Sequence, residues 1–248
     1  MNVNLLLDSQ SLYARCWYAS KEDPDKAVEL SLGLLRSIVD PWGDRVPDEW
    51  KPTHALWCWD SGRKTDKPGR LRPGVYYDTM DRVHDTVVAE LGGCNAEVPG
   101  EEADDVVATA AVQSTARGEL AVVASGDKDL HQLHGSKVKI FCLCEKGIIS
   151  ARHICRKWGI HHPDQLSVAL ALVGDQCDGI PGVAGIGEVR CKALFKKLSP
   201  TATLGETVDF MLNALDDEKA AEFVGSLEVT LLKTDLVGVG QPAPLLTL

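Results

Sequence analysis

Short apolar runs alternate with longer amphipathic segments along most of the chain. The runs lie at 3–7, 54–59, 120–124 and 138–143, and segments with helical spacing lie at 103–112, 203–215 and 217–232. Runs of this length separated by helical segments predict α/β units with a mainly parallel sheet. There is no internal repeat, and the closing QPAPLLTL predicts a poorly ordered tail.

The size of the chain suits one large domain, or one domain with a smaller appendage. It has 248 residues, of which 44% are apolar and 25% charged, an ordinary balance for a globular protein. We expect an α/β core over 1–165 and a helical region over 166–248. No segment approaches the ~20 apolar residues that cross a bilayer. The start lacks a basic region and reaches Asp8 early, so we expect a cytoplasmic protein that is not secreted and has no membrane partner.

The cysteines are scattered and form no C-x-x-C pair. A zinc site or a disulfide framework is the alternative to reduced, mostly buried thiols, and the scatter favours the thiols. Cys142 and Cys144 alternate in an apolar run, as strand residues would.

Acidic residues follow the predicted strands. Asp8 ends the first run, Asp60 ends the second, and the third runs into SGDKDL with Asp127 and Asp129. Ligands of open α/β sheets bind outside the carboxyl ends of the strands. We therefore expect these carboxylates to share one rim of the sheet.

Two further acidic groups complete the pattern. Glu101, Glu102, Asp104 and Asp105 open a helix in EEADDVVATAA, and GDQCDG supplies Asp175 and Asp178. Taken alone, the first group would complement a helix dipole and the second would be a helix-ending loop. Carboxylates gathered together repel one another, however, so a fold that collects them needs compensating cations.

Oxygen ligands without histidine or thiolate favour Mg²⁺, with Mn²⁺ as an alternative. The acids are too many for one ion, and two ions roughly 3.5–4 Å apart would activate water and clamp a phosphodiester. The pattern predicts phosphoryl-transfer hydrolysis.

The glycine-rich stretch GIPGVAGIGEVRCKAL follows the last aspartates. Backbone N–H groups at such a turn and helix start form a phosphate site, and loop carbonyls could hold K⁺. Arg190, Lys192, Lys196 and Lys197 follow on the helix and would flank a DNA backbone. The alternative is a plain helix–turn–helix in the core.

Together these motifs resemble the 5′ nuclease family: flap endonucleases, the 5′ nuclease domain of bacterial DNA polymerase I, and phage 5′→3′ exonucleases. LLLDSQSLYAR, ALWCWD, EEADDVVATAA, VVASGDKDLHQL and GDQCDGIPGVAGIG occur in family order, and the resemblance covers about 3–198. It implies a PIN-like parallel sheet flanked by helices, a helix–three-turn–helix element that grips duplex, and two Mg²⁺ ions, with K⁺ at the loop.

The resemblance assigns roles residue by residue. Ligands around the first metal are Asp8, Asp60, Glu102, Asp104 and Asp127, and around the second Asp129, Asp175 and Asp178. Asp105 matches the last aspartate of the E-A-D-D motif. Arg15 stands where the family has an arginine near the substrate phosphate, and Gly182, Gly185 and Gly187 would shape the duplex grip with Arg190 and Lys192.

The family's arch over single-stranded 5′ DNA corresponds to 61–95, where this chain departs from the family pattern. Arg70 fits the first basic position, Tyr76 or Tyr77 the tyrosine, and Arg82 the last arginine. The segment looks shorter than usual. Its basic residues followed by tyrosines suit backbone contact and base stacking, with a solvated charged loop as the alternative; the basic residues are Arg63, Lys64, Lys67, Arg70 and Arg72.

The formal net charge is −10, from 26 basic and 36 acidic residues. Binding depends on where charge sits, and acids that hold metal ions do not repel DNA as free ones do. We therefore expect a two-faced, monomeric metal-dependent nuclease for DNA with 5′ flaps, nicks or ends. The alternatives are a PIN-like ribonuclease and a non-catalytic, structure-specific DNA-binding protein.

Overall fold

The computed structural model describes residues 1–39, 47–61, 72–176 and 178–246. The chain divides into two compact units. Unit 1 comprises Met1–Asp127, Lys137–Ile148 and Lys233–Leu248, and unit 2 comprises Lys128–Ser136 and Ile149–Leu232. This division differs from the expected boundary at residue 165, because the chain enters unit 2 earlier and its last segment returns to unit 1.

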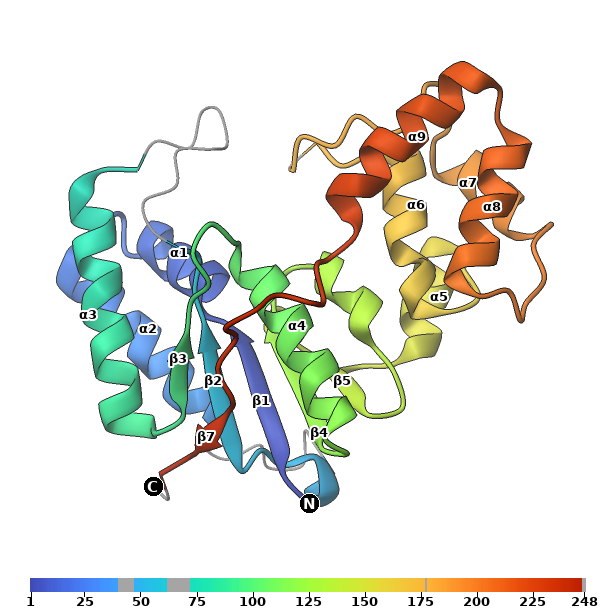
Figure 1. Cartoon of the computed structure of the whole chain (residues 1–248). Coiled ribbons are helices and arrows are strands. Elements are labelled where there is room, and N and C mark those ends of the chain that lie inside the picture. Colours follow the sequence, from blue (N-terminus) through green and yellow to red (C-terminus); the bar gives the residue numbers. More distant parts are fainter. Residues whose placement is uncertain (40–46, 62–71, 177, 247–248) are drawn as a thin grey trace. The chain divides into compact units, whose positions relative to one another are not determined.

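Unit 1 is built on one mainly parallel sheet, as the apolar runs predicted (Figure 1). The strand order is β3-β2-β1-β4-β5-β6. Its strands are β1 (Val3–Asp8), β2 (His54–Cys58), β3 (Cys94–Ala96), β4 (Leu120–Ser125), β5 (Val138–Cys142) and β6 (Gly147–Ile149). β1 pairs in parallel with β2 and with β4, and Asp8 lies opposite Cys58 in the register. The carboxyl ends of β1, β2 and β4 therefore meet at one edge of the sheet.

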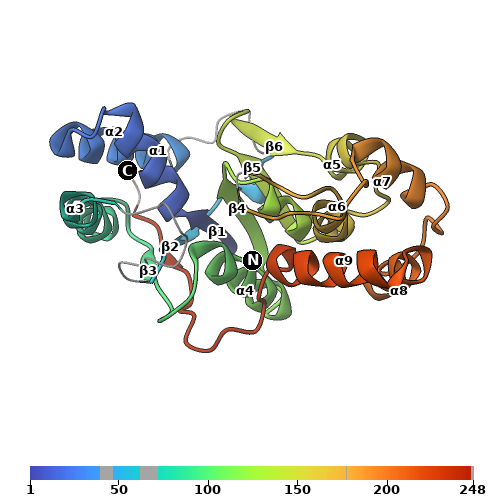
Figure 2. The same cartoon turned by 90° about the horizontal axis from the view of Figure 1, so that it is seen from above.

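Helices cover both faces of this sheet. Figure 2 shows α1 (Ser9–Ala19), α2 (Pro24–Val39) and α3 (Gly74–Leu91) on one face and α4 (Ala103–Ala116) on the other. Every residue of β1 and of β4 is buried, as expected for strands covered on both sides. Leu5, Leu7 and Trp57 join the hydrophobic core beneath α1–α3.

Unit 2 is helical. It contains α5 (Ala151–Trp158), α6 (Leu166–Val173), α7 (Glu188–Phe195), α8 (Leu204–Ala214) and α9 (Asp217–Thr230), and the short 3₁₀ turns η3 (Asp129–Leu133) and η4 (Pro163–Gln165); a further turn, η2 (Asp48–Trp50), belongs to unit 1. α6 packs against α9 and α7. A capping box of Thr203 and Glu206 starts α8. In the described ranges no helix is both long and apolar enough to span a membrane.

The described part of the predicted poorly ordered tail, residues 241–246, contains a short strand, which corrects that prediction for these residues. β7 (Ala243–Pro244) pairs antiparallel with the start of β2. Its neighbourhood is closed by backbone hydrogen bonds from Leu245 N to Thr53 O at 3.0 Å and from Gly93 N to the carbonyl of Pro244 at 2.9 Å. Proline is tolerated because it lies on an edge strand, where it needs only to accept.

The cysteines of the described residues are free thiols, and Cys16, Cys58, Cys142 and Cys191 are buried as expected. Cys144 is exposed, since β5 ends at Cys142 and the chain turns away before it. The strand alternation predicted for this pair is therefore wrong at its second member.

Deleting residues 241–248 should destabilise the protein, because it removes β7 and the hydrogen bonds of Pro244 and Leu245. With each bond worth a net 0.5–1.5 kcal/mol, the free energy of unfolding should fall by about 2–4 kcal/mol in urea melts. Deleting only 247–248 is the matched control. An unchanged urea midpoint in the longer deletion would show that this segment does not support the sheet.

Candidate metal centre

Asp8 is fixed at the carboxyl end of β1 by hydrogen bonds from two directions. Its Oδ1 accepts from the backbone N–H of Ser11 at 2.9 Å and so caps α1, and its Oδ2 accepts from the Ser125 hydroxyl at 3.0 Å. The Ser125 oxygen accepts in turn from the N–H of Asp127 at 2.9 Å. With 4% of its surface exposed, Asp8 has one orientation, tied to the end of β4.

Asp60, which follows β2, is hydrogen-bonded to the start of α4. Its Oδ1 accepts a 2.9 Å hydrogen bond from the N–H of Ala103, the first residue of the helix. The first N–H groups of a helix have no partner within it, so this carboxylate both satisfies one and fixes where the helix begins. Glu102 and Asp104 are thereby held at the same end of the sheet as Asp8.

The charge of these carboxylates is costly in the protein alone. Burial raises the pKa of Asp8 to about 7, against the hydrogen bonds from Ser11 and Ser125, which lower it. Burial, followed by the charges of Asp105 and Glu102, raises the pKa of Asp104 to about 8. A divalent cation would offset both the burial and the repulsion, and hard oxygen donors fit Mg²⁺ or Mn²⁺. The first acidic group therefore suits a metal.

Glu101 and Asp105, the other two acids at the start of α4, contact a lysine. Lys233, which follows α9, pairs its ammonium with the Glu101 carboxylate and lies 3.6 Å from Asp105 Oδ2. Its backbone N–H also donates to Asp105 Oδ1 at 2.7 Å. The structure therefore places Asp105 against a lysine, and the expected role of Asp105 in catalysis stays a prediction. No local sequence signal connects residues so far apart.

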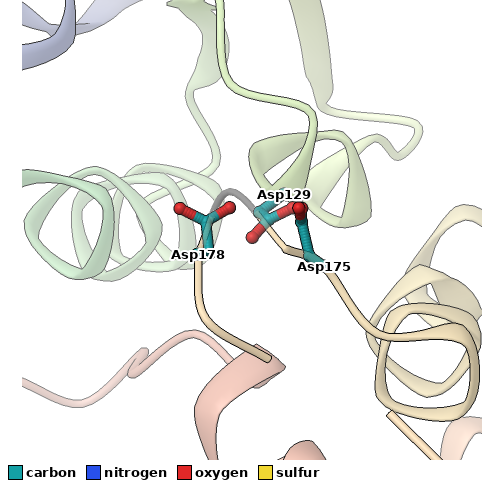
Figure 3. A group of neighbouring side chains, drawn as sticks. All are labelled: Asp129, Asp175 and Asp178. Atoms are coloured by element: carbon teal, nitrogen blue, oxygen red, sulfur yellow. The ribbon is translucent and has the colours of Figure 1, made fainter. Parts of the chain in front are cut away.

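A second acidic cluster lies in unit 2 (Figure 3). Asp129 begins η3, and Asp175 and Asp178 lie on the loop after α6. One carboxylate oxygen from each lies within 4.8 Å of the other two. Asp175 and Ile180 exchange backbone hydrogen bonds of 2.9 and 2.8 Å, which close the loop that presents both acids. The three predicted ligands of the second metal are thus brought together.

Two glycines make this loop possible. Gly174 and Gly182 have φ of 81° and 70°, a region that side chains rarely adopt. A Cβ on Gly182 would lie 2.6 Å from the nitrogen of Gly174 and 2.8 Å from the oxygen of Val173. Gly182, predicted to shape a DNA grip, is therefore required for the backbone contact that holds the acidic loop, and Gly174 was missed.

Lys128 lies among these three acids. Its ammonium hydrogen-bonds Asp175 Oδ2 and lies 3.8 Å from one oxygen each of Asp129 and Asp178. Burial lowers the pKa of Lys128, but the bond to Asp175 and the neighbouring negative charges outweigh it and raise the pKa. Only the acids of SGDKDL were predicted site residues; Lys128, which lies between them in the sequence, was not.

The arch segment gives a mixed outcome. Arg63, Lys64, Lys67 and Arg70 lie outside the described residues. The prediction that Tyr76 stacks on bases is wrong for this structure, because the side chain is fully buried and its ring packs edge-on at 4.9 Å from Tyr13.

The remaining arch residues have their own contacts. The Arg72 guanidinium lies over the Tyr76 ring at 4.4 Å and donates a hydrogen bond to the Tyr76 hydroxyl. The group that was predicted to contact DNA is therefore engaged within the protein. Tyr77 is half-buried, and Arg82 pairs with Asp25 at 2.8 Å.

Other predicted phosphate contacts stand on the surface. Arg15 is exposed on α1 and Arg190 on α7, and Lys192 lies 3.5 Å from Glu188 one turn earlier. In the glycine loop the N–H of Ala184 donates to Glu222 at 2.8 Å, so a phosphate there would use other N–H groups or displace this carboxylate. Gly185 has φ of 75° and Gly187 caps α7 with φ of −91°.

The chain is similar to a known protein family and to several known proteins. Residues 3–159 match the family described as "5'-3' exonuclease, N-terminal resolvase-like domain". The 5′-3′ exonuclease of Bacillus subtilis is 30% identical over 87% of this chain and 75% of the relative. The flap endonuclease Xni of Colwellia psychrerythraea is 27% identical over 97% of this chain and 88% of the relative.

Longer relatives and solved structures extend the comparison. The chain spans only 28% of DNA polymerase I of Bacillus subtilis, to which it is 29% identical. The phage T5 D15 protein, co-crystallised with metal ions, has the same fold, with a TM-score of 0.71 at 14% identity over 94% of this chain and 90% of that one.

The raised pKa of Asp8 and of Asp104 predicts the pH dependence of stability without metal. Folding keeps both carboxyls protonated up to about pH 7, whereas the unfolded chain loses these protons near the ordinary value of 3.8. The stabilisation that each protonated carboxyl contributes to the free energy of unfolding is therefore full below pH ~4. It falls by about 1.4 kcal/mol per pH unit and is lost as pH rises through about 7 for Asp8 and about 8 for Asp104. Urea melts in EDTA should show this slope reduced in Asp8→Asn, and equal slopes in the variant and the unmodified protein would contradict it.

Gly182→Ala and Gly187→Ala form a matched pair. Gly182→Ala should weaken Mn²⁺ binding and lower the melting temperature, because its Cβ meets the backbone of α6, while Gly187→Ala has open space and an ordinary φ. Calorimetric titration with Mn²⁺ and thermal melts measure both. Equal effects of the two substitutions would show that the close backbone contact is unimportant.

Proposed function

Because the chain belongs to the 5′-3′ exonuclease family, we propose that it hydrolyses DNA phosphodiester bonds near 5′ ends, as a 5′→3′ exonuclease and structure-specific flap endonuclease. The observation that carries this proposal is the set of carboxylates at the ends of β1 and β2 and at the start of α4, inside the matched region. Such a set has no use in a protein that only binds DNA, since it repels phosphate unless cations are bound.

Two divalent ions fit the two acidic groups. The proposed ligands of the first are Asp8, Asp60, Glu102, Asp104 and Asp127, and those of the second are Asp129, Asp175 and Asp178. The donors are carboxylates, so Mg²⁺ is the expected ion and Mn²⁺ its substitute. Bound divalent ions would lower the pKa of water and offset the charge of the phosphodiester.

The protein's own residues supply orientation and substrate contact. Ser11 and Ser125 hold both oxygens of Asp8, so this ligand does not have to reorganise when it meets a cation. Asp60 sets the start of α4 and with it Asp104. Exposed Arg15 would contact the phosphate near the cut.

Duplex DNA would lie against α7 and the glycine loop. Arg190 and Lys192 are available for non-specific backbone contact, and loop carbonyls would hold K⁺. DNA with 5′ flaps, nicks or 5′ ends is the proposed substrate, and a monomer suffices for this arrangement.

The proposal is tested with a labelled DNA that carries a single-stranded 5′ flap on duplex. A Mg²⁺-dependent product of about flap length would identify a flap endonuclease, and mono- or short oligonucleotides a 5′→3′ exonuclease. The same substrate in RNA separates a ribonuclease from both. Binding without any product, with or without Mg²⁺, would refute a catalytic role.

Asp127→Ala should abolish this cleavage while leaving DNA affinity within a few-fold. The variant lacks a proposed ligand of the first metal ion, and without that ion both the activation of water and the stabilisation of the phosphate charge are lost. Single-turnover cleavage in Mg²⁺ and fluorescence anisotropy with the same DNA measure the two effects. The nuclease assignment fails if Asp127→Ala turns over as fast as the unmodified protein.

A further inference from the structure

The second acidic cluster already contains a cation of the protein's own. Lys128 contacts all three of its carboxylates: it bonds Asp175 and lies 3.8 Å from Asp129 and from Asp178. Among the described contacts, one ammonium therefore serves three carboxylates.

The carboxylates that the ammonium contacts are also those that a divalent ion would need. The three carboxylate oxygens lie within 4.8 Å of one another, so any ion that touches all three must enter the space between them. Mg²⁺ requires oxygen ligands at about 2.0–2.1 Å in near-octahedral geometry. An ammonium hydrogen-bonded to Asp175 would repel such an ion and compete with it for the same carboxylates.

Lys128 has a way out that does not require the loop to open. Its side chain is 31% exposed, whereas that of Asp175 is only 9% exposed. A lysine has a flexible four-carbon stem, so rotation would carry the ammonium to solvent. Asp175 and Asp178 stay in place, because backbone bonds between Asp175 and Ile180 close the loop that carries them.

We propose that Lys128 is the resident counter-cation of the second acidic cluster, and that a divalent metal binds there by displacing its ammonium. Lys128 stabilises the metal-free arrangement of Asp129, Asp175 and Asp178 and weakens metal binding by the same contacts. It is a positioning residue that sets how much metal the second site needs. The inference rests on the proposed function only for the class of metal.

The test measures Mn²⁺ binding to the full chain without DNA, by calorimetry, together with thermal melts in EDTA. Lys128→Met keeps the length of the side chain and removes its charge. It should tighten Mn²⁺ binding to one site at least about five-fold, the lower end of couplings between two binding events, and lower the metal-free melting temperature. Lys219→Met, which removes a surface lysine paired with Asp216 in the same unit, controls for net charge and should change Mn²⁺ affinity less than about two-fold.

A double variant assigns the effect to this cluster. In an Asp175→Asn background, Lys128→Met should tighten Mn²⁺ binding clearly less, because the charged partner that Lys128 bonds is already lost while its 3.8 Å contacts with Asp129 and Asp178 remain. Unchanged or weaker Mn²⁺ binding by Lys128→Met alone would overturn the proposal, and so would the same gain in both backgrounds.

The unmodified protein supplies a measurement that does not depend on folding of a variant. Reductive methylation followed by peptide mass spectrometry reports how accessible each lysine amine is. Saturating Mn²⁺ should increase labelling of Lys128 several-fold and leave Lys219 unchanged, and equal labelling of Lys128 with and without Mn²⁺ would overturn the proposal. These readouts use no DNA cleavage, so failure of the proposed nuclease activity and failure of this inference are separate results.

Discussion

Repulsion between gathered carboxylates is the constraint on which this structure depends. Negative charges placed close together need hydrogen bonds or cations, and the two acidic groups obtain them differently. Asp8 is buried and holds its position through Ser11 and Ser125, and its raised pKa shows that these bonds do not offset the burial. The cluster in unit 2 instead has the ammonium of Lys128. Both arrangements hold carboxylates in place in the metal-free protein.

The sequence predicted the features that follow from local pattern. The apolar runs indicated β1, β2 and β4, and a parallel sheet necessarily carries Asp8 and Asp60 to one edge, because each follows the end of its strand. The spacing of apolar residues predicted α4, α8 and α9. Short-range rules are sufficient here, since a strand end and the residue after it are joined covalently, and the direction of the strands decides where that residue lies.

Other features depend on contacts between residues far apart in the chain, which no local pattern records. Lys233 meets Asp105 across 128 residues, and nothing in the KTDLVG sequence marks it as a partner of an acidic motif. Tyr76 was expected to stack on bases because basic residues precede it, yet it lies on the buried face of α3 and packs against Tyr13 in the core. QPAPLLTL was expected to be a poorly ordered tail, but an edge strand needs few donors and β7 forms at Ala243–Pro244.

The position of the lysines also explains how an acidic chain can act on DNA. The Lys128 ammonium pairs with the Asp175 carboxylate, and the Lys233 ammonium pairs with the Glu101 carboxylate. A count of basic residues includes both lysines, but neither is proposed as a DNA contact. The exposed residues Arg15 and Arg190 remain for phosphate, and arginine suits this role because its fork binds two oxygens. The net charge of −10 therefore does not describe how charge is distributed over the protein. In the proposed function, bound metal ions would neutralise the acids, and the field that a nucleic acid meets would depend on a few arginines and on the ions themselves.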